Sequence, residues 1–334
     1  MSSSALEART TGGFTLVEIS IVLAVIGLIV GGILVGQDLI SAAGVRAQIS
    51  QIEKYQTAVN TFRGKYGYLP GDMNASTARL FGFAARGAFA GEGDGNGLIE
   101  GIDSNAAASN DGANIVQGET AMFWVDLGQA GLVDGGFNAG SPIGAGAVQS
   151  TVSATGVSLF FPPAKLGSGN FVYVWSGGWT IGSESSNTND GYNYFGLSNI
   201  SGISNSISGS YPQALSSNQA LTVKQAYSID TKIDDGLPQF GRVLALYVNP
   251  CIGGFWAGNT VCSTFTITIP TNIYDQDRVP QGGPITSTSV TNSATPTDPA
   301  NCYDNNNITA TTERYSIKTN NGAGYNCALS FRFQ

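Results

Sequence analysis

The stretch Gly13-Phe14-Thr15-Leu16-Val17-Glu18 opens an apolar run that continues without a further charge from Ile19 to Gly36. The run is long enough to cross a bilayer, whose hydrocarbon core is about 30 Å thick. A carboxylate inside hydrocarbon costs roughly 2.5–3.5 kcal/mol on insertion scales, so Glu18 needs a partner. Cleavage after Gly13 would supply one, because the new ammonium of Phe14 would lie near Glu18 and opposite charges attract strongly in a dry environment.

From Thr11 to Leu34 the chain resembles the processing site of type IV pilins and type II secretion pseudopilins. In that family a membrane aspartyl peptidase cuts after the glycine and methylates the new amino-terminal Phe. The resemblance implies that Gly13 and Phe14 are processing residues and that Glu18 acts in assembly. The chain departs from the family in its leader, where Glu7 opposes the single Arg9, and in the absence of a proline from the apolar helix.

The resemblance implies an α+β, pilin-like fold in which a long amino-terminal helix packs on an antiparallel β-sheet head with large loop insertions. Residues 1–13 would be a cleaved leader, 14–36 a transmembrane or filament-core helix, 37–64 its amphipathic continuation, and 65–334 a periplasmic or extracellular head. A looser resemblance to large bacterial pilin-like proteins rests on Trp124 with Ala130-Gly131-Leu132, on 163–167 and on 229–238.

The same resemblance implies partners and a location. The partners would be a prepilin peptidase, other pilin or pseudopilin subunits and an inner-membrane assembly platform. The chain would cross the bacterial inner membrane once, with its head in the periplasm, and then join a periplasmic or cell-surface filament.

An ordinary secretory signal is the alternative interpretation of the amino terminus, with Ala42-Ala43 as the cleavage region. An acidic residue inside the apolar segment is unusual for such a signal. Amino-terminal sequencing separates the two, because the pilin interpretation predicts Phe14 as the first residue and the signal interpretation predicts Gly44.

Composition narrows the function classes. The net charge of −8 argues against a sequence-independent grip on nucleic acid or anionic lipid. The chain has no histidine, which removes Ser-His-Asp and Cys-His catalysis and zinc sites with imidazole ligands. Asp230, Asp234 and Asp235 are close in sequence, but nothing in the pattern marks one of them as an acid of raised pKa. We therefore expect that the protein is not an enzyme.

The four cysteines all fall in the last quarter of the chain and form no Cys-x-x-Cys pair. Behind a membrane-crossing segment the domain would lie in an oxidising compartment, where disulfides form. Four cysteines allow three connectivities, and proximity in sequence favours Cys251–Cys262 and Cys302–Cys327. The second bridge would hold the carboxy-terminal strand predicted at 328–333.

Beyond Gly36 apolar residues recur at intervals of three or four, which predicts that the helix continues with one buried stripe. Gly64, Gly67 and Pro70 predict its end. The stripe consists of Val45, Ile49, Ile52, Tyr55, Val59, Phe62 and Tyr66. The apolar half also holds four glycines, which favour either close helix packing or a soft point at Gly31-Gly32; they are Gly27, Gly31, Gly32 and Gly36.

The rest of the chain predicts short elements joined by loops. Helices are expected at 119–130, with Gly131 as the cap, and at 221–230. Strands are expected at 171–175, 242–248 and 264–269, paired as an antiparallel sheet. Residues 281–300 are rich in Ser, Thr and Pro and predict an exposed loop.

One acidic loop matches a calcium-binding pattern. Glu92, Asp94, Asn96 and Asp103 fall at the first, third, fifth and twelfth positions of an EF-hand-like loop, and Gly97 falls at its turn position. Short aspartate-glycine segments also form plain turns, which is the alternative interpretation. Calcium is therefore a possible cofactor rather than a required one.

The leading functional hypothesis is a structural one. The chain would be a minor or large subunit of a type IV pilus or type II secretion filament, assembled by packing of its amino-terminal helix, with Glu18 paired to the Phe14 amino terminus. The alternative is a membrane-tethered binding or adhesin module whose head holds a glycan or a protein. Secretion, adhesion, motility and DNA uptake stay open.

Overall fold

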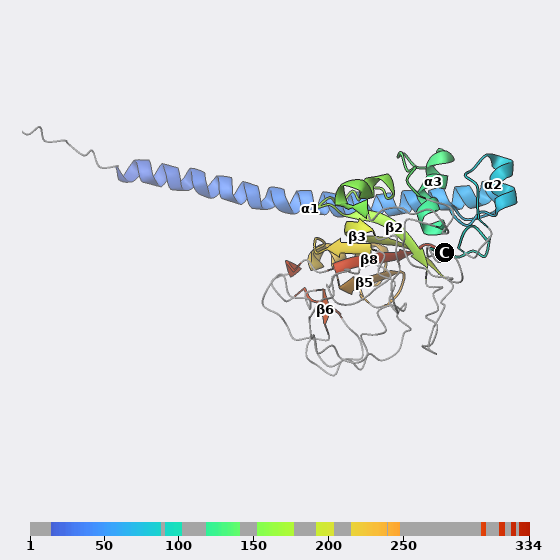
Figure 1. Cartoon of the computed structure of the whole chain (residues 1–334). Helices are drawn as coiled ribbons and strands as arrows, with labels where there is room; N and C mark the ends of the chain where they lie inside the picture. The colour runs from blue at the N-terminus through green and yellow to red at the C-terminus, as the bar shows by residue number, and fades with distance from the viewer. Residues whose placement is uncertain are drawn as a thin grey trace, which may run out of the picture. The chain divides into compact units, whose positions relative to one another are not determined.

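The computed structural model describes residues 15–87, 91–101, 118–140, 152–176, 192–203, 215–238, 240–247, 302–304, 314–317, 322–324 and 327–334 (Figure 1). It divides the chain into two compact units, Met1–Gly44 and Val45–Gln334, and each is described by itself. Several predicted features lie outside the described residues: the cleavage pair Gly13 and Phe14, the ligand Asp103, the pair Cys251 and Cys262, the strand 264–269 and the loop 281–300.

Helix α1 runs without interruption from Leu16 to Tyr66, as the pattern predicted. In the first unit its large apolar side chains are exposed, from 50% at Ile19 to 86% at Leu16. Among the described residues it is the one helix that is long and apolar enough to cross a membrane. Its end lies three residues beyond Arg63, and Gly67 then takes a positive φ of 82° while its N–H donates to the Arg63 carbonyl at 2.8 Å.

In the second unit the predicted stripe of α1 faces the core. Its members Val45, Ile52, Tyr55, Val59 and Phe62 are buried, and Ile49 and Tyr66 pack partly buried against the same cluster. The Tyr55 ring meets Trp124 edge-on at 4.8 Å between centroids and lies 6.2 Å from Phe195. These rings join α1, a second helix and the central strand of the sheet into one apolar core.

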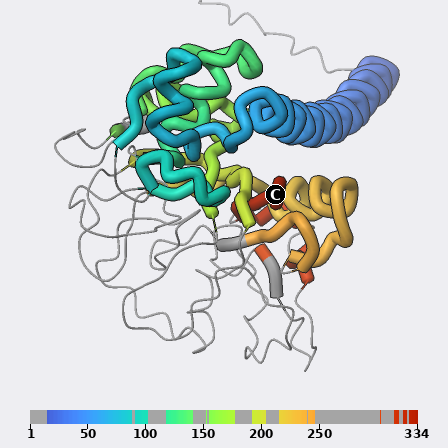
Figure 2. Tube along the Cα trace, turned by 90° about the vertical axis from the view of Figure 1, so that its right-hand side faces the viewer, coloured from blue at the N-terminus to red at the C-terminus, as the bar shows by residue number. Residues whose placement is uncertain are grey.

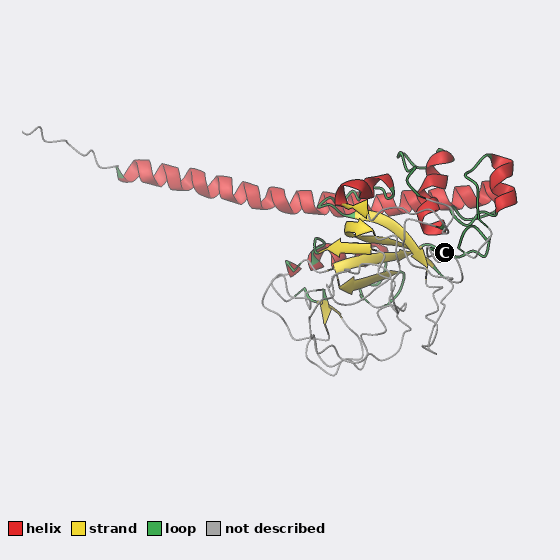
Figure 3. Ribbon diagram, in the orientation of Figure 1, coloured by secondary structure: helices red, strands yellow, loops and turns green. Residues whose placement is uncertain are grey.

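In the described part of the chain three shorter α-helices follow α1 (Figure 3), and the residues at their ends explain where they begin and stop. Helix α2 covers Ala75–Phe81 and begins at Asn74, whose side chain accepts from the Thr77 N–H. Helix α3 covers Glu119–Gln129, close to its predicted range, and Gly131 follows with a positive φ of 69°. Helix α4 covers Val223–Ile233, and Thr222 and Gln225 form a capping box at its start. A 3-10 helix, η1, spans Ala154–Leu159.

The described strands form one antiparallel sheet of six strands and a separate pair. The larger sheet has the order β1-β3-β8-β5, and β2 and β4 also pair with β3. Its strands are β1 (Val152–Ser153), β2 (Phe171–Ser176), β3 (Asn193–Ile203), β4 (Leu215–Asn218), β5 (Val243–Tyr247) and β8 (Cys327–Arg332). The pair consists of β6 (Tyr303–Asp304) and β7 (Arg314–Tyr315). Figure 2 shows the carboxy-terminal strand, in red, among the other described elements of the head.

The central strand β3 was not predicted, and its sequence explains why. It carries Gly196, Asn199 and Gly202, residue types that usually mark loops. Gly196 has a packing reason, because a Cβ there would come 2.2 Å from the Tyr173 ring of the paired strand β2. The predicted strands at 171–175, 242–248 and 328–333 are confirmed as β2, β5 and β8 with small changes at their ends.

The predicted bridge between Cys302 and Cys327 is confirmed. Both cysteines are buried, and Cys327 is the first residue of β8. The Cys302 carbonyl accepts the Ser316 N–H at 3.0 Å, next to β7. The disulfide therefore ties the small β6–β7 pair to the main sheet.

Candidate functional site

The start of α1 is a capping box, in which an N-cap Thr or Ser and an acid three residues later satisfy each other's main-chain groups. The Thr15 N–H and hydroxyl donate to Glu18 Oε2 at 2.8 and 2.9 Å, and the Glu18 N–H donates to Thr15 Oγ1 at 3.2 Å. The Glu18 carboxylate, for which the sequence analysis expected a partner, therefore accepts hydrogen bonds from Thr15 in the first turn of the helix. Pairing with the Phe14 ammonium stays a prediction.

The glycines of the apolar half lie in a continuous helix. A Cβ added at Gly27, Gly31, Gly32 or Gly36 would meet nothing within 4 Å. These glycines are therefore not required by packing within the described part of this chain. Close approach of a neighbouring helix and a soft point both stay predictions.

The main chain of the acidic loop of the head, residues 91–101, surrounds the carboxylates of Asp72 and Glu119, which lie outside the loop in sequence. Gly95 and Gly97 donate their N–H groups to the two oxygens of Asp72 at 2.7 and 2.9 Å. Gly93 and Glu100 donate to the two oxygens of Glu119 at 2.9 and 3.0 Å. The loop takes this course because a glycine stands at every second position, and the glycines at 91, 93, 95 and 97 all have positive φ.

Asp72, Asp94 and Glu119 converge, with a carboxylate oxygen of each lying within 4.8 Å of the others. Asp72 and Glu119 are buried, and Asp94 is exposed. Burial, opposed by hydrogen bonds from the loop amides, raises the pKa of Asp72 to about 7, and the nearby charge of Asp94 adds to the rise. Burial first, and then the charges of Asp72, Glu100 and Asp94, raise the pKa of Glu119 well above its ordinary value.

This cluster has the donor chemistry of a hard cation site. All three groups offer oxygen, which Ca²⁺ prefers, and a carboxylate has about four lone-pair sites. Both oxygens of Asp72 and Oε2 of Glu119 each accept one main-chain N–H and keep a further lone pair for a cation, whereas Oε1 of Glu119 accepts two, from Gly93 at 2.9 Å and Asp94 at 3.3 Å. A divalent ion would offset both the burial of the charges and the repulsion between them, which together raise the two pKa values, and proton uptake is the competing way to relieve them.

The structure describes three of the four calcium ligands predicted from the sequence, since Asp103 lies outside the described residues. Of these three, Asp94 belongs to the converging group of acids. Asn96 instead donates its side-chain amide to Asp94 and Glu100 and accepts the Leu98 N–H. Glu92 is buried but does not belong to the converging group of acids. Residues 83–87, which lie before the loop, form no helix, so the described part of the chain does not form an EF-hand.

Sequence reasoning missed Asp72 and Glu119 as candidate ligands. Asp72 lies in the turn that follows α1, and Glu119 is the first residue of α3, where an acid is common because it complements the helix dipole. Neither position has a spacing relationship to the loop that a linear motif could detect.

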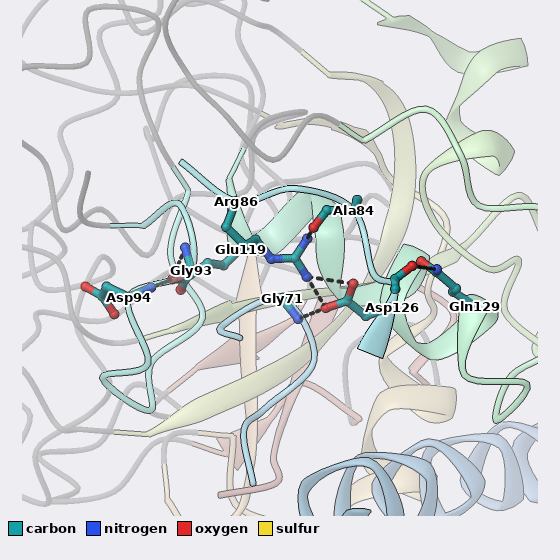
Figure 4. A network of polar contacts seen from close by, with 9 residues as sticks. Gly71, Ala84, Arg86, Gly93, Asp94, Glu119, Asp126 and Gln129 are labelled. Carbon is teal, nitrogen blue, oxygen red and sulfur yellow. Dashed lines mark hydrogen bonds and ion pairs between the residues drawn. The ribbon is translucent and has the colours of Figure 1, made fainter. Parts of the chain in front are cut away.

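A buried ion pair holds the turn of Asp72 in place (Figure 4). Arg86 donates to both carboxylate oxygens of Asp126 at 2.7 and 2.5 Å, and both side chains are fully buried. Asp126 also accepts the Gly71 N–H at 2.7 Å. Gly71 has to be glycine, because its φ is 86° and a Cβ would lie 2.4 Å from the Glu119 carbonyl oxygen. The pair thereby positions the residue that precedes Asp72.

A second group of acids, Asp230, Asp234 and Asp235, also gathers in the head. The Tyr315 hydroxyl donates to Asp230 at 2.8 Å and the Gly236 N–H donates to it at 3.2 Å. Burial raises the pKa of Asp230 to about 7 against these two hydrogen bonds. The sequence had not marked Asp230 as an acid of raised pKa, because the burial that causes the shift depends on the packing of α4.

Asp234 and Asp235 satisfy main-chain groups of the turn that follows α4. Asp234 accepts the N–H groups of Arg242 and Val243, and Asp235 accepts that of Leu237. All three acids of this group therefore have structural partners among the described residues.

Comparison with protein-family models, with curated proteins and with solved structures finds no match for this chain.

Proposed function

We propose that this protein is a membrane-anchored structural subunit of a pilin-like filament, either a type IV pilus or a type II secretion filament. A prepilin peptidase would cleave it after Gly13 in the inner membrane, and an assembly platform would pack its amino-terminal helix beside those of other subunits. Repetition of one such heterologous contact builds an open helical array. The role is structural rather than enzymatic.

The observation that carries the proposal is the composition of α1. One continuous helix contains an apolar segment with exposed side chains and a following segment whose buried stripe builds the core of an antiparallel sheet domain. A single acid, Glu18, stands in its first turn. Large exposed apolar surfaces mark membrane or protein contacts. The helix thus has the parts that a subunit needs for insertion, for lateral packing and for holding a head.

Processing is tested by amino-terminal sequencing of the full-length protein after co-expression with a prepilin peptidase. The proposal expects Phe14 as the first residue. A protein that keeps its first thirteen residues while it forms its working complex contradicts the proposal, and Gly44 as the first residue supports the signal-peptide interpretation.

The assembly role of Glu18 is tested by Glu18→Ala. We expect insertion into the membrane to be unchanged and incorporation into filaments to fall at least tenfold, because the carboxylate that would pair with the Phe14 ammonium and align the subunits is lost. Glu53→Ala is the matched control, since Glu53 is an exposed carboxylate on the same helix. Equal filament yield from both variants would count against the mechanism.

The tethered binding module is distinguished from the filament subunit by crosslinking. A cysteine placed at Gly31 has room, because a Cβ there meets nothing within 4 Å. Ladders of multimers through Gly31→Cys indicate a polymer, whereas monomers indicate a head on a tether that holds a glycan or protein.

Within this proposal, the converging acids of the head favour a calcium ion as a structural cofactor. The group of Asp72, Asp94 and Glu119 replaces the EF-hand ligand set, and the all-oxygen donors suit Ca²⁺. The ion would stabilise the head and would not take part in a reaction.

A further inference from the structure

The carboxy-terminal part of the chain contacts helix α4 at two places along the helix. At the start of α4, the Val223 N–H donates to the Gly324 carbonyl at 2.8 Å. Further along, the Tyr315 ring of β7 lies 5.8 Å from the Tyr227 ring, and the Tyr315 hydroxyl donates to Asp230 Oδ2 at 2.8 Å. Tyr315 and Gly324 therefore join this part of the chain to two different turns of one helix.

The disulfide between Cys302 and Cys327 connects the segments that make these contacts. The Cys302 carbonyl accepts the Ser316 N–H at 3.0 Å, directly after β7, and the Cys327 N–H donates to the Leu221 carbonyl at 3.3 Å, just before α4. Both cysteines and Ser316 are at most 4% exposed. A closed ring of contacts thus runs from the disulfide through β7 to Asp230, and back along α4 to the disulfide.

We propose that the Tyr315–Asp230 contact is a proton-controlled latch, which holds β7 against α4 and keeps reductants away from the Cys302–Cys327 disulfide. Asp230 is protonated when the latch is closed, and loss of that proton favours the release of Tyr315. The latch goes beyond the proposed function, because it is a property of the head and needs no filament.

Burial makes the contact sensitive to charge. Asp230 is fully buried, and it accepts hydrogen bonds from the Tyr315 hydroxyl and from the Gly236 N–H. A neutral carboxyl is stable in such surroundings, whereas a carboxylate there has lost its hydration and is repelled by the charges of Asp234 and Asp235. Release of Tyr315 would admit water to the carboxylate and so relieve both costs.

The charged neighbours of Asp230 come from α4 and from the elements packed on it. Asp235 and Asp234, in the turn after the helix, act on Asp230 through their charges. Strand β5 carries no charged residue, and on β8 the Arg332 guanidinium lies 4.5 Å from the Tyr192 ring centroid. The other charged or titratable residues of α4 and β7 are Lys224, Tyr227, Lys232 and Arg314.

The sign of the pH effect follows from proton binding. The closed latch holds the Asp230 proton with a pKa of about 7, whereas an opened and hydrated carboxyl has the ordinary pKa of 3.8. Opening therefore releases a proton between these two values, so the equilibrium constant for opening rises with pH from about 4 to about 7 and then levels off. We expect the open population to grow at least about tenfold between pH 5 and pH 7, and less than about twofold between pH 7 and pH 8.

The test measures how fast a water-soluble phosphine reduces the Cys302–Cys327 disulfide in the full chain in mild detergent. Each reduced disulfide consumes one phosphine and one water, and it yields one phosphine oxide and two thiols, which are alkylated and identified by peptide mapping. Each rate is divided by the rate for the urea-unfolded chain at the same pH, which removes the pH dependence of the reagent. The latch predicts that this normalised rate follows the open population, and a normalised rate that is independent of pH would overturn the proposal.

Asp230→Asn removes the titrating group at nearly constant shape. We expect the normalised rate of this variant to be independent of pH between 5 and 8. The same rise with pH as in the unmodified chain would overturn the proposal, because another group would then control the opening.

Tyr315→Phe removes the hydroxyl of the latch and keeps its ring. We expect reduction at pH 5 to become roughly two- to tenfold faster, the factor that corresponds to one lost hydrogen bond. Tyr227→Phe is the matched control, because it removes a hydroxyl from the other ring of the same pair, which is 37% exposed. Equal acceleration by both variants would contradict a specific role for the Tyr315 hydroxyl and overturn the latch.

Hydrogen exchange separates local opening from unfolding of the whole head. The main-chain amides of β3, the central strand, exchange through global unfolding, whereas the latch opens β7 alone. We expect the exchange of β3, corrected for its intrinsic rate, to change much less between pH 5 and pH 7 than the normalised rate of reduction. An equal change in both would assign the effect to the whole head and overturn the latch.

Discussion

The two parts of α1 follow opposite patterns of burial. In the first unit Leu28 and Ile40 are 79% and 75% exposed, whereas in the second unit Gln48 and Gln51 are 0% and 8% exposed. Hydropathy alone would predict the reverse, with the leucine and isoleucine buried and the glutamines exposed. The apolar part therefore depends on surroundings outside the single chain, whereas the two buried glutamines of the other part have partners inside it.

The partners of the buried glutamines are main-chain groups of one loop. Gln51 donates to the Pro163 carbonyl at 2.9 Å and accepts the Lys165 N–H at 2.8 Å. Gln48 accepts the Leu166 N–H at 3.1 Å. The two side chains thus bind main-chain groups of the loop that follows the Pro163–Phe171 β-bridge. The amide of Gln51 is satisfied, as buried amides usually are, whereas Nε2 of Gln48 has no hydrogen-bond partner among the described residues.

Of the two parts of α1, the buried one should affect the stability of the head most, and the largest loss is expected when an aromatic side chain of the core is removed. Phe62 is fully buried, with its ring centroid 4.6 Å from Tyr66 and 5.5 Å from Phe83. Phe62→Ala should lower the unfolding free energy of the head by about 3–5 kcal/mol. Leu28→Ala on the exposed part should leave it unchanged. Thermal unfolding of the full chain in detergent, followed by near-UV circular dichroism, measures both, and equal shifts would refute the comparison.

Calcium is expected to act on the second unit alone. If the ion is held by Asp72, Asp94 and Glu119, calcium at about a hundred times its dissociation constant should stabilise the head by about 2.7 kcal/mol. Thermal unfolding of the full chain with calcium and with chelator measures this, and Asp72→Asn should lose most of the difference. Asp38→Asn, in the first unit, is the control. No calcium-dependent shift in the unmodified chain would remove the ion from the proposal.

The buried glutamine predicts a smaller effect with a sharper contrast. Gln51→Leu keeps the side-chain volume but leaves the Pro163 carbonyl and the Lys165 N–H without their partner, which costs roughly 1–3 kcal/mol. Gln37→Leu makes the same change at an exposed position of the first unit, and the head should not respond. Chemical denaturation of the full chain in mild detergent compares the two variants. A stabilised Gln51→Leu would mean that the amide is not needed.

The smallest effect concerns pH. The folded chain holds Asp230 with a pKa of about 7, above the ordinary 3.8, so the folded state binds its proton more tightly than the unfolded state. The stability that this proton contributes is fully present below about pH 4, is lost as the pH rises from about 4 to about 7, and changes no further once the carboxylate is ionised in both states.

Asp230→Asn should flatten that part of the pH profile and shift the melting temperature by a few degrees, while the exposed Asp235→Asn should not. Melting temperatures between pH 5 and 8 provide the measurement. Parallel profiles for Asp230→Asn and the unmodified chain would show that this carboxylate does not titrate in the range.

Periodicity predicted the helices well because they depend on local pattern. The continuous α1, the capped helix near 119 and the helix near 221 lie within a few residues of their expected ranges. The capping box at the start of α1 is also local, because the Thr-x-x-Glu spacing of Thr15 and Glu18 is a sequence signature of this cap.

The cluster of Asp72, Asp94 and Glu119 in the head could be predicted only in part from the sequence. The glycine-acid alternation around Asp94 indicated a loop for a cation, yet Asp72 and Glu119 come from two other elements. Their approach depends on the turn at Gly71, the buried Arg86–Asp126 pair and the start of α3. No spacing rule connects positions that are joined only by packing.

A membrane-length apolar segment headed by one acid and a helix that continues into an amphipathic stripe follow from the sequence alone, which also favours the adjacent pairing of Cys302 with Cys327. These features depend on local periodicity, local caps and short loop closure. The folded chain was needed to show that β3 is the central strand, that two glutamines are buried, and that Asp72 and Glu119 join Asp94. Those outcomes depend on which distant groups exclude water together, and that information is spread over the whole chain.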